Sequence, residues 1–349
     1  MSQTLDACLA DLEARLDEKQ EEASRRAWRT FLAGECREEI FYPPARKPSP
    51  PKTKWPDVHI NDAQDDFELM LLSQFQGVSN HLANGGAMCL GVRCNYGTGI
   101  LPSLFGCDLF IMPRETNTLP TATPLHSREK MKALVAAGVP DPRAGLGGKV
   151  FDCAERFLDA LRKHPKVGRC VALYHPDVQG PIDAAEVVWG SDIFLAFYEE
   201  PELLKDLLDL ITRTYAAFMH RWYALVPPED GESTHWEIRH RGRLMIRNDS
   251  LMNLSPSLYV EYVRPLDQRL LDEFGGGAIH FCGKGSHYIE AMSQVRGLHG
   301  IQMSQPHLND METIYRHTVD KGIPLLSFDR KTAEAAKAAG RKLRGRVQC

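Results

Sequence analysis

The stretch Gly277-Ala278-Ile279-His280-Phe281-Cys282-Gly283 decides the fold class, because it carries an apolar strand into a polar, glycine-containing turn. Helical patterns lie on either side of it, over 256–274 and 286–295. Ser255-Pro256 places a capping residue before a first-turn proline, which is typical of a helix start. A strand that alternates with helices predicts a parallel sheet, since each parallel step needs a long crossover.

The same alternation extends outward from this segment over most of the chain. Predicted strands cover 87–93, 108–112, 169–174, 243–248, 277–281, 298–303 and 323–328, with weaker candidates at 233–238 and 344–348. Predicted helices cover 65–78, 150–163, 200–225, 256–274, 286–295 and 307–320. About eight strands in this length predict an α/β fold of the (β/α)₈ TIM-barrel type, although an open doubly wound sheet would give a similar pattern.

The N-terminal part differs in composition. Leucines recur at helical spacing within residues 4–33, which predicts an amphipathic helix. Six prolines within 43–56 forbid regular structure and predict an extended connector. We therefore expect an N-terminal helical arm and proline-rich connector over 1–61, followed by a barrel catalytic domain over 62–349.

Charge and cysteine content limit the class of partner. The 349 residues carry a formal net charge of -4 and are 43% hydrophobic, so neither nucleic acid nor an anionic membrane is favoured. No apolar run approaches membrane-spanning length, and no secretory leader precedes the nine cysteines. We expect a cytoplasmic protein with a small-molecule substrate.

In a barrel, chemistry is expected where the strands end. The polar residues at these points are Asn95, Tyr96, Asp177, Gln179, Asn248, Asp249, His280, Cys282, Gln302, Gln305 and Asp329. Asp249 could act as a general acid or base, and Asp177 with Gln179 could orient a substrate. Asn95, Tyr96 and Asn248 are expected to line the pocket, although polar loops in water explain such residues as well.

His280 and Cys282 are the best candidates for metal ligands. Residues two apart in an extended chain point the same way, and zinc prefers imidazole nitrogen and thiolate sulfur. Cys349, after the short run at 345–348, is the favoured third ligand, and Asp329 competes with it. The plainer alternatives are a strand-end histidine beside a buried thiol, an idle terminal cysteine, and an aspartate that caps helix 330–340.

At several of these segments the chain resembles the uroporphyrinogen decarboxylase superfamily, which includes zinc-dependent methyltransferases that act with corrinoid proteins. The resemblance runs from about residue 65 to the end. It is carried by Asp177-Val178-Gln179-Gly180-Pro181, by 201–208, by Asp249-Ser250 with Leu254-Ser255-Pro256, and by His280-Phe281-Cys282-Gly283. It implies a (β/α)₈ barrel with its pocket at the strand C-termini.

The sequence departs from true uroporphyrinogen decarboxylases. The N-terminal arginine-rich signature, the tyrosine after the third-strand Gly-Pro and a C-terminal Gly-His-Gly are missing. His280 and Cys282 instead match the first two zinc ligands of the methyltransferase branch, and Cys349 matches the third by its order along the chain. The resemblance also hints at a homodimer and at a corrinoid protein as partner.

These observations predict a zinc-dependent methyltransferase-like enzyme that moves a methyl group between a corrinoid or small methylated substrate and a thiol. Two alternatives stay open. One is a cofactor-independent decarboxylase of a tetrapyrrole-like or other carboxylated substrate, in which Asp249 or Asp177 stabilises the intermediate. The other is a non-catalytic barrel that binds a tetrapyrrole or corrinoid.

Overall fold

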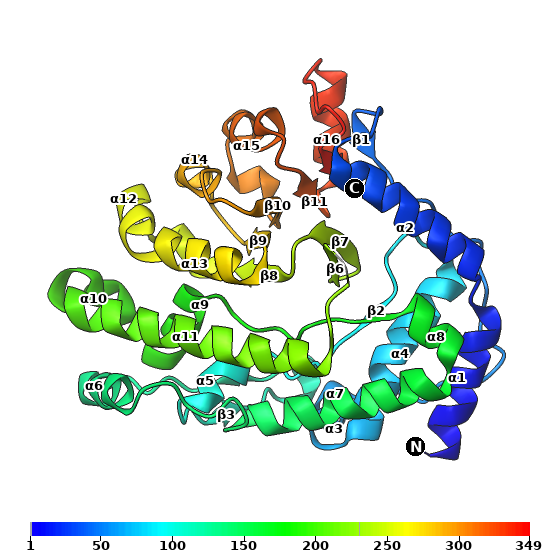
Figure 1. Cartoon of the computed structure of the whole chain (residues 1–349), viewed down its shortest axis with the longest axis horizontal. Helices are drawn as coiled ribbons and strands as arrows, with labels where there is room; N and C mark the ends of the chain where they lie inside the picture. Colours follow the sequence, from blue (N-terminus) through cyan, green and yellow to red (C-terminus); the bar gives the residue numbers. More distant parts are fainter. Residues whose placement is uncertain (1, 230) are drawn as a thin grey trace.

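The computed structural model describes residues 2–229 and 231–349, and its main sheet is parallel. The six strands of this sheet run in the order β1-β12-β11-β10-β9-β8. Their bounds are β1 Ile40–Phe41, β8 Leu244–Arg247, β9 Gly277–Phe281, β10 Leu298–Met303, β11 Leu325–Leu326 and β12 Val347–Gln348. A second parallel pair joins β2, Gly91–Val92, to β5, Ala172–Leu173. Figure 1 shows the helices arranged around the outside of these strands.

The predicted α/β class is confirmed, whereas a closed barrel is not present in the described part of the chain. No strand ladder joins β5 to β8 or β1 to β2 there. Between the β5 and β8 sides of the ring there are isolated hydrogen bonds, such as that from the Gly180 amide to the Arg247 carbonyl at 3.0 Å. The eight parallel strands therefore form an incompletely paired ring, made of a six-stranded part and a two-stranded part.

A hairpin lies against the strands of the ring. β6, Glu232–His235, and β7, Ile238–Arg241, pair antiparallel where the sequence predicted one weak strand at 233–238. β7 contacts both β9 and β10, and Ile238 packs with Met245, Ala278 and Leu326 of three ring strands. The hairpin thus occupies space that neighbouring strands would otherwise share.

Two sequence predictions near the N-terminal half need correction. The strand expected over 108–112 is β3, Leu109–Phe110, which pairs antiparallel with β4, Thr121–Ala122, outside the ring. The single helix expected over 4–33 is two helices, α1 Gln3–Arg15 and α2 Glu18–Ala33. Asp17 breaks them apart, because its carboxylate accepts the amides of the first turn of α2.

The remaining helices mostly follow the expected pattern. They are α3 Ile60–Asp65, α4 Phe67–Asn84, α5 Ile100–Leu104, α6 Arg128–Ala137, α7 Leu146–Lys163, α8 Pro165–Cys170, α9 Pro181–Trp189, α10 Ile193–Glu199, α11 Pro201–Leu225, α12 Pro256–Leu258, α13 Arg264–Phe274, α14 Ile289–Met292, α15 Met311–His317 and α16 Arg330–Ala338. A π-helical turn over Tyr259–Val263 separates α12 from α13. Pro265 explains it, because proline has no amide to continue the α-helical ladder. No helix in the described residues is long and apolar enough to cross a membrane.

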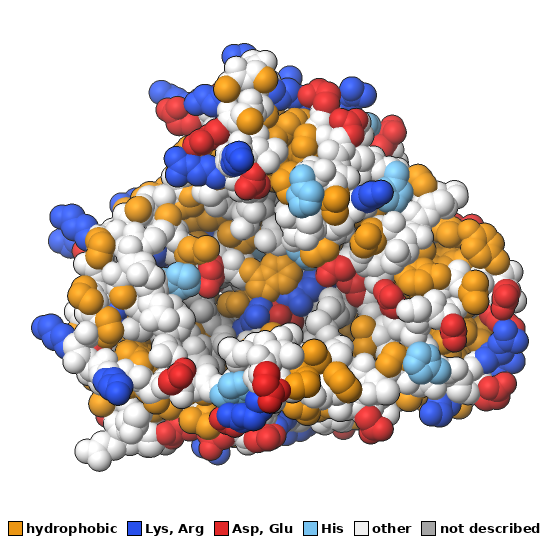
Figure 2. Space-filling view, turned by 180° about the vertical axis from the view of Figure 1, so that it is seen from behind, with side chains coloured by type: hydrophobic (Ala, Val, Ile, Leu, Met, Phe, Trp, Pro, Cys, Tyr) orange, Lys and Arg blue, Asp and Glu red, His pale blue; other side chains and the backbone are white. Residues whose placement is uncertain are grey.

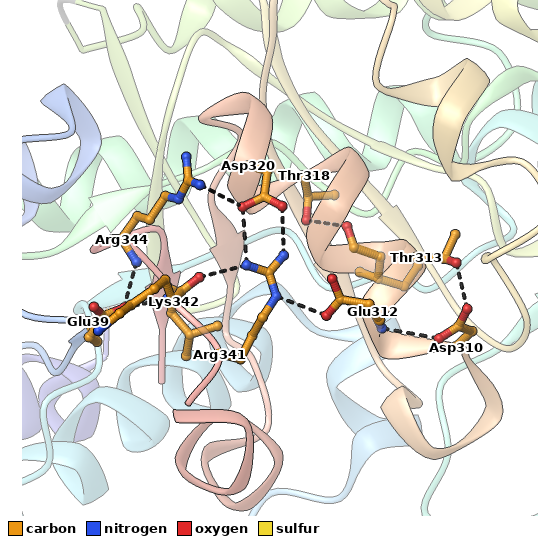
Figure 3. Close-up of polar contacts among 11 residues, drawn as sticks. Glu39, Asp310, Glu312, Thr313, Thr318, Asp320, Arg341, Lys342 and Arg344 are labelled. Atoms are coloured by element: carbon orange, nitrogen blue, oxygen red, sulfur yellow. Dashed lines mark hydrogen bonds and ion pairs between the residues drawn. The ribbon is translucent and has the colours of Figure 1, made fainter. Parts of the chain in front are cut away.

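The last strand of the chain lies in the main sheet beside a strand from the N-terminal part. β1 pairs with β12, so the segment after α2 belongs to the same sheet as the C-terminus. The carboxylate of Glu39 accepts the backbone amide of Arg344 at 2.8 Å, and Arg341 is paired with Asp320 and Glu312 (Figure 3). These contacts hold the strand at the C-terminal end of the chain in place.

Candidate metal centre

Three potential metal ligands meet where β8 and β9 end. Nε2 of His280 lies 3.3 Å from Sγ of Cys282 and 3.2 Å from Oδ1 of Asp249. All three donor atoms lie within 4.8 Å of one another. Zinc bonds of about 2.0–2.3 Å in a tetrahedron put neighbouring donor atoms roughly 3.3–3.8 Å apart. The donor types and their spacing therefore fit a zinc ion.

The geometry distinguishes this cluster from a Cys-His-Asp nucleophilic triad. In such a triad the acid and the nucleophile use different ring nitrogens of the histidine. Here the thiol and the carboxylate both approach Nε2, while the buried Nδ1 has no hydrogen-bond partner in the described part of the chain. This arrangement differs from a proton relay and is compatible with three donors around one metal ion.

Strand register brings these residues together. In the parallel pairing of β8 with β9, Arg247 lies opposite His280. Asp249 and Cys282, each two residues further along, therefore lie side by side just after the C-terminal ends of the two strands. The Cys282 amide then donates to Asp249 Oδ1 at 2.8 Å. Gly283 follows with φ +73°, and a Cβ there would lie 2.7 Å from Met252 Sδ, so a larger residue would be strained.

Hydrogen bonds from neighbouring segments fix the loop that follows Cys282. The amide of Gly283 donates to Gln305 Oε1 at 2.6 Å. Asn309 accepts the amides of Gly285 and Ser286 and donates to the Gly283 carbonyl. The thiol is therefore held by a loop whose backbone has few free polar groups, which preorganises it for a ligand.

Within the cluster, His280 and Asp249 each stabilise the charged form of the other. Burial disfavours the imidazolium, yet hydrogen bonds with Asp249 and Cys282 outweigh it and raise the pKa of His280 to about 9. Burial would raise the pKa of Asp249, but its hydrogen bond with His280 keeps it below the usual value. Asp183 accepts the amides of Asp249 and Ser250, and its own burial, with the charge of Asp249, raises its pKa to about 7.

A second polar cluster lies beside the first, at the ends of β2 and β5. Oδ1 of Asp177 accepts from Arg93 at 2.7 Å, from the Trp236 indole at 3.3 Å, and from Arg247. The Arg247 guanidinium lies over the Trp236 ring at 4.1 Å. The Trp236 ring in turn meets the His280 ring edge-on, with centroids 4.9 Å apart. Burial would raise the pKa of Asp177, but the two arginines lower it, so this carboxylate stays ionised.

The predicted pocket residues occupy varied places. Asn95 accepts from Arg93 Nε at 3.0 Å, so it supports the second cluster. Asn248 is fully buried and its amide donates to Asp267 at 2.9 Å. Gln179 is buried and its Oε1 has no hydrogen-bond partner among the described residues, and Tyr96 is buried in the hydrophobic core. Of these residues, Asn95 alone hydrogen-bonds a member of either cluster through its side chain in the described structure.

The structure separates both proposed third ligands from the cluster. Cys349 directly follows β12, and its amide donates to the Phe41 carbonyl. Burial, followed by the charge of Asp329, raises the pKa of its thiol to about 12. Asp329 caps α16 by accepting the Thr332 amide at 2.7 Å. Neither joins His280 and Cys282 among the described residues, where Asp249 takes the third place.

Three functional candidates were missed in the sequence: Arg93, Arg247 and Trp236. A signal existed for the arginines, because each is a charged residue at the end of an apolar predicted strand. Trp236 gave no such signal. It forms the hairpin tip with Glu237, and both residues have positive φ, 45° and 67°.

Trp236 and Arg93 also line a cavity of about 310 Å³. Its remaining walls come from α4, β2, Tyr174 and Glu237. Figure 2 shows that the face seen there is deeply hollowed, with apolar, basic and acidic side chains on the floor of the hollow. The centre of the molecule is thus accessible to a small molecule from one face.

The fold and cluster define an α/β protein with an incompletely paired ring of parallel strands and a candidate metal centre at the strand ends. No protein-family model and no curated protein sequence matches the chain. Among solved structures, a chain described as a methyltransferase from Methanosarcina mazei has the same fold, with a TM-score of 0.61. The alignment covers 93% of this chain and 91% of that chain at 16% sequence identity. That likeness establishes the fold.

Proposed function

We propose that this protein is a zinc-dependent methyltransferase-like enzyme, which transfers a methyl group between a corrinoid or small methylated substrate and a thiol. The observation that carries the proposal is the convergence of Asp249, His280 and Cys282 on one point at the strand ends. The fold likeness to a methyltransferase supports it.

Each residue of the cluster has a definite part in this proposal. Nε2 of His280, Sγ of Cys282 and Oδ1 of Asp249 would hold the ion, with a fourth position left for substrate. A bound zinc ion would keep an incoming thiol deprotonated near neutral pH. Asp183 and Asn248 position the loop that carries Asp249, and Gln305 with Asn309 position the loop that carries Cys282.

The decarboxylase alternative has less support from the geometry. It requires Asp177 or Asp249 to face a substrate cation. Asp177 instead already accepts from two guanidinium groups and an indole, and Asp249 is bonded to the Cys282 amide and His280. Both carboxylates therefore already have cationic or amide partners at Oδ1, which offset part of the negative charge that a protonated pyrrole would need.

Metal analysis tests the proposal. Protein purified without chelator is expected to carry about one zinc per chain, and His280→Ala, Cys282→Ser and Asp249→Asn should each lose most of it. Cys36→Ser is the matched control, since Cys36 lies in the turn after α2 and outside the cluster. Wild-type protein without metal, or equal metal in all the variants, would refute the proposal.

A methyl-transfer assay then separates zinc binding from activity. Wild-type protein is incubated with methylcobalamin and a small thiol, and the loss of the methyl–cobalt absorption is followed. The three ligand variants should be inactive while Cys36→Ser keeps wild-type activity. Zinc bound without turnover in every condition would leave a metal site but remove the proposed reaction.

A further inference from the structure

Strands β8 and β10 pair with β9 on its two sides, and each places a polar residue beside His280. Arg247 of β8 and Gln302 of β10 are the register partners of His280. Register partners on neighbouring strands point to the same face of a sheet, and the strands lie about 4.7–4.9 Å apart. The three side chains therefore form a row across the sheet, with a proposed zinc ligand in the middle.

Nδ1 of His280 needs a hydrogen-bond acceptor when Nε2 binds a metal ion. A histidine that binds zinc through Nε2 carries its hydrogen on Nδ1, and metal sites almost always provide an acceptor for that N–H, which fixes the orientation of the ring. Here Nδ1 is buried and has no partner among the described residues. A buried donor without an acceptor is unfavourable, so a neighbouring group is expected to supply one.

Of the two register partners, Gln302 alone can supply this acceptor. The guanidinium of Arg247 only donates hydrogen bonds, and the indole of Trp236, which meets the His280 ring edge-on, offers only a donor. The Gln302 amide has a carbonyl oxygen, Oε1, which is buried and has no partner in the described part of the chain. An unpaired donor and an unpaired acceptor thus lie in one row, and rotation of the flexible Gln302 side chain is enough to join them.

A second polar residue of β10 lies beside the other ligand of β9. Ser304 follows Gln302 by two residues, and the Cys282 thiol donates to its Oγ at 3.4 Å. When a metal ion binds the sulfur as a thiolate, the Ser304 hydroxyl can donate in the opposite direction. The Ser304 amide donates to the Phe281 carbonyl at 3.3 Å, so backbone pairing continues past the end of β10. β10 therefore presents one supporting group to each ligand of β9.

We propose that Gln302 is a positioning residue of the metal centre, which accepts the Nδ1 hydrogen of His280 and so holds Nε2 toward the metal ion. Ser304 has the corresponding, lesser role at Cys282. This inference rests on the proposed function for the metal, and it adds that β10, which supplies no ligand, sets the affinity of the site. β10 is paired on both sides, by β9 and β11, which gives these side chains a rigid base.

Metal affinity tests the role of Gln302. Cobalt(II) is titrated into metal-free full-length protein as a coloured substitute for zinc, and zinc affinity is then measured by competition with a chelating dye. Gln302→Leu cannot accept a hydrogen bond, so its zinc affinity should fall about 10–100-fold. Gln302→Glu keeps an acceptor and should bind zinc at least as tightly as the wild type. If Gln302→Leu does not fold, Gln302→Met, which is unbranched like glutamine, takes its place.

Two further variants calibrate the affinity measurement. Ser304→Ala should weaken zinc binding less than Gln302→Leu does, because Ser304 is exposed and water can replace its hydroxyl. Gln294→Leu is the matched control, since Gln294 is an exposed glutamine that accepts from Arg264 outside the cluster. It should leave the zinc affinity unchanged.

The hydrogen on Nδ1 of His280 gives a readout that a merely structural role would not change. A hydrogen-bonded imidazole N–H exchanges slowly with water, so its NMR signal should be present in the wild type and in Gln302→Glu, and absent from Gln302→Leu. His280→Ala identifies the signal. The same pattern is expected with and without zinc, because Asp249 and Cys282 face Nε2 in the metal-free protein.

The outcomes separate this inference from the proposed function. Unchanged zinc affinity in Gln302→Leu, or a loss in Gln302→Glu as large as in Gln302→Leu, would overturn the role of Gln302 while the metal centre stands. If the wild type binds neither cobalt nor zinc, the proposed function fails and the NMR signal decides alone. A signal lost only in Gln302→Leu would then uphold the contact with His280, and a signal missing from the wild type or kept in Gln302→Leu would refute it.

Discussion

The two parts of the strand ring present their chemistry by different means. The six-stranded part holds His280 and Cys282 on a continuous parallel ladder, so backbone pairing fixes where the side chains lie. The two-stranded part holds Arg93 and Asp177 at the ends of two short strands, and there side-chain contacts to the hairpin replace a ladder. We therefore expect the first part to tolerate loss of a ligand side chain, and the second to depend on its polar side chains for its shape.

This contrast implies that the same kind of substitution has opposite consequences in the two parts. Changes at the metal cluster should affect metal content with little effect on folding, because Asp249 and Cys282 are partly exposed. Changes at the arginine–aspartate cluster should affect folding first.

Asp177→Ala should have the largest effect. It leaves Arg93 and Arg247 buried together without their shared carboxylate, and breaking a buried ion pair in this way costs about 3–5 kcal/mol. The free energy of unfolding from urea denaturation measures the loss. Asp272→Ala, which breaks the exposed pair with Arg296, should cost about 0–1 kcal/mol. A loss of that small size for Asp177→Ala would show that side chains do not hold the two-stranded part.

Ile238→Ala tests whether the hairpin ties the two parts together. Ile238 is buried against Met245, Ala278 and Leu326, so its truncation should cost about 3 kcal/mol. Leu109→Ala, in the outer hairpin of β3 and β4, is the control, because Leu109 is already exposed. If both substitutions have similarly small effects on the urea midpoint, the β6–β7 hairpin is not part of the core.

The same contrast explains how much could be predicted from the sequence. The strands at 277–281 and 298–303 were predicted to the residue, and each has a parallel neighbour on both sides in the six-stranded sheet. The hairpin was largely missed, since Glu232-Ser233-Thr234-His235 is polar and Trp236-Glu237 lacks the Asn-Gly signal of a tight turn. Local patterns therefore located the parallel strands of both parts except β1, which lies within the residues predicted as an N-terminal arm and connector. The hairpin follows from contacts between distant segments.

The candidate site shows the same division. His280 and Cys282 are two residues apart, so one strand is enough to predict that they face the same way. Asp249 was recognised as a strand-end acid, but its place in the cluster depends on the register between β8 and β9. Arg93, Asp177 and Trp236 come from three distant segments, and no spacing in the sequence relates them.

His240→Gln tests the pH sensitivity of the hairpin. Burial lowers the pKa of His240 to about 4, although its hydrogen bond to the Arg241 carbonyl raises it, and nearby His175, Arg239 and His299 also disfavour a charge. A lowered histidine pKa stabilises the fold above the unfolded value near 6.5 and loses that effect as pH falls toward 4. Between pH 7 and pH 5 the wild type should lose about 2 kcal/mol more than His240→Gln. Chemical denaturation at both pH values measures the difference.

Equal losses in the two proteins would contradict this prediction and would mean that His240 is accessible to protons in the folded state. His220→Gln is the control, since His220 is exposed and pairs with Glu273 on the surface. It should follow the wild-type pH dependence within about 0.5 kcal/mol, as expected for an exposed charge pair.

The smallest effects are expected for Asp329 and Cys349, the two residues that the sequence offered as a third zinc ligand. Substitutions there test whether the metal centre consists of Asp249, His280 and Cys282 alone. Asp329→Ala removes the cap of α16 and should cost about 1 kcal/mol, since one amide partner is lost. Cys349→Ser should change stability by about 0.5 kcal/mol or less. Both variants should keep the zinc content of the wild type, because neither residue lies in the cluster of Asp249, His280 and Cys282. A loss of zinc in Cys349→Ser would instead mean that β12 approaches β9 when metal binds, which would require the continuous ladder of the six-stranded part to rearrange.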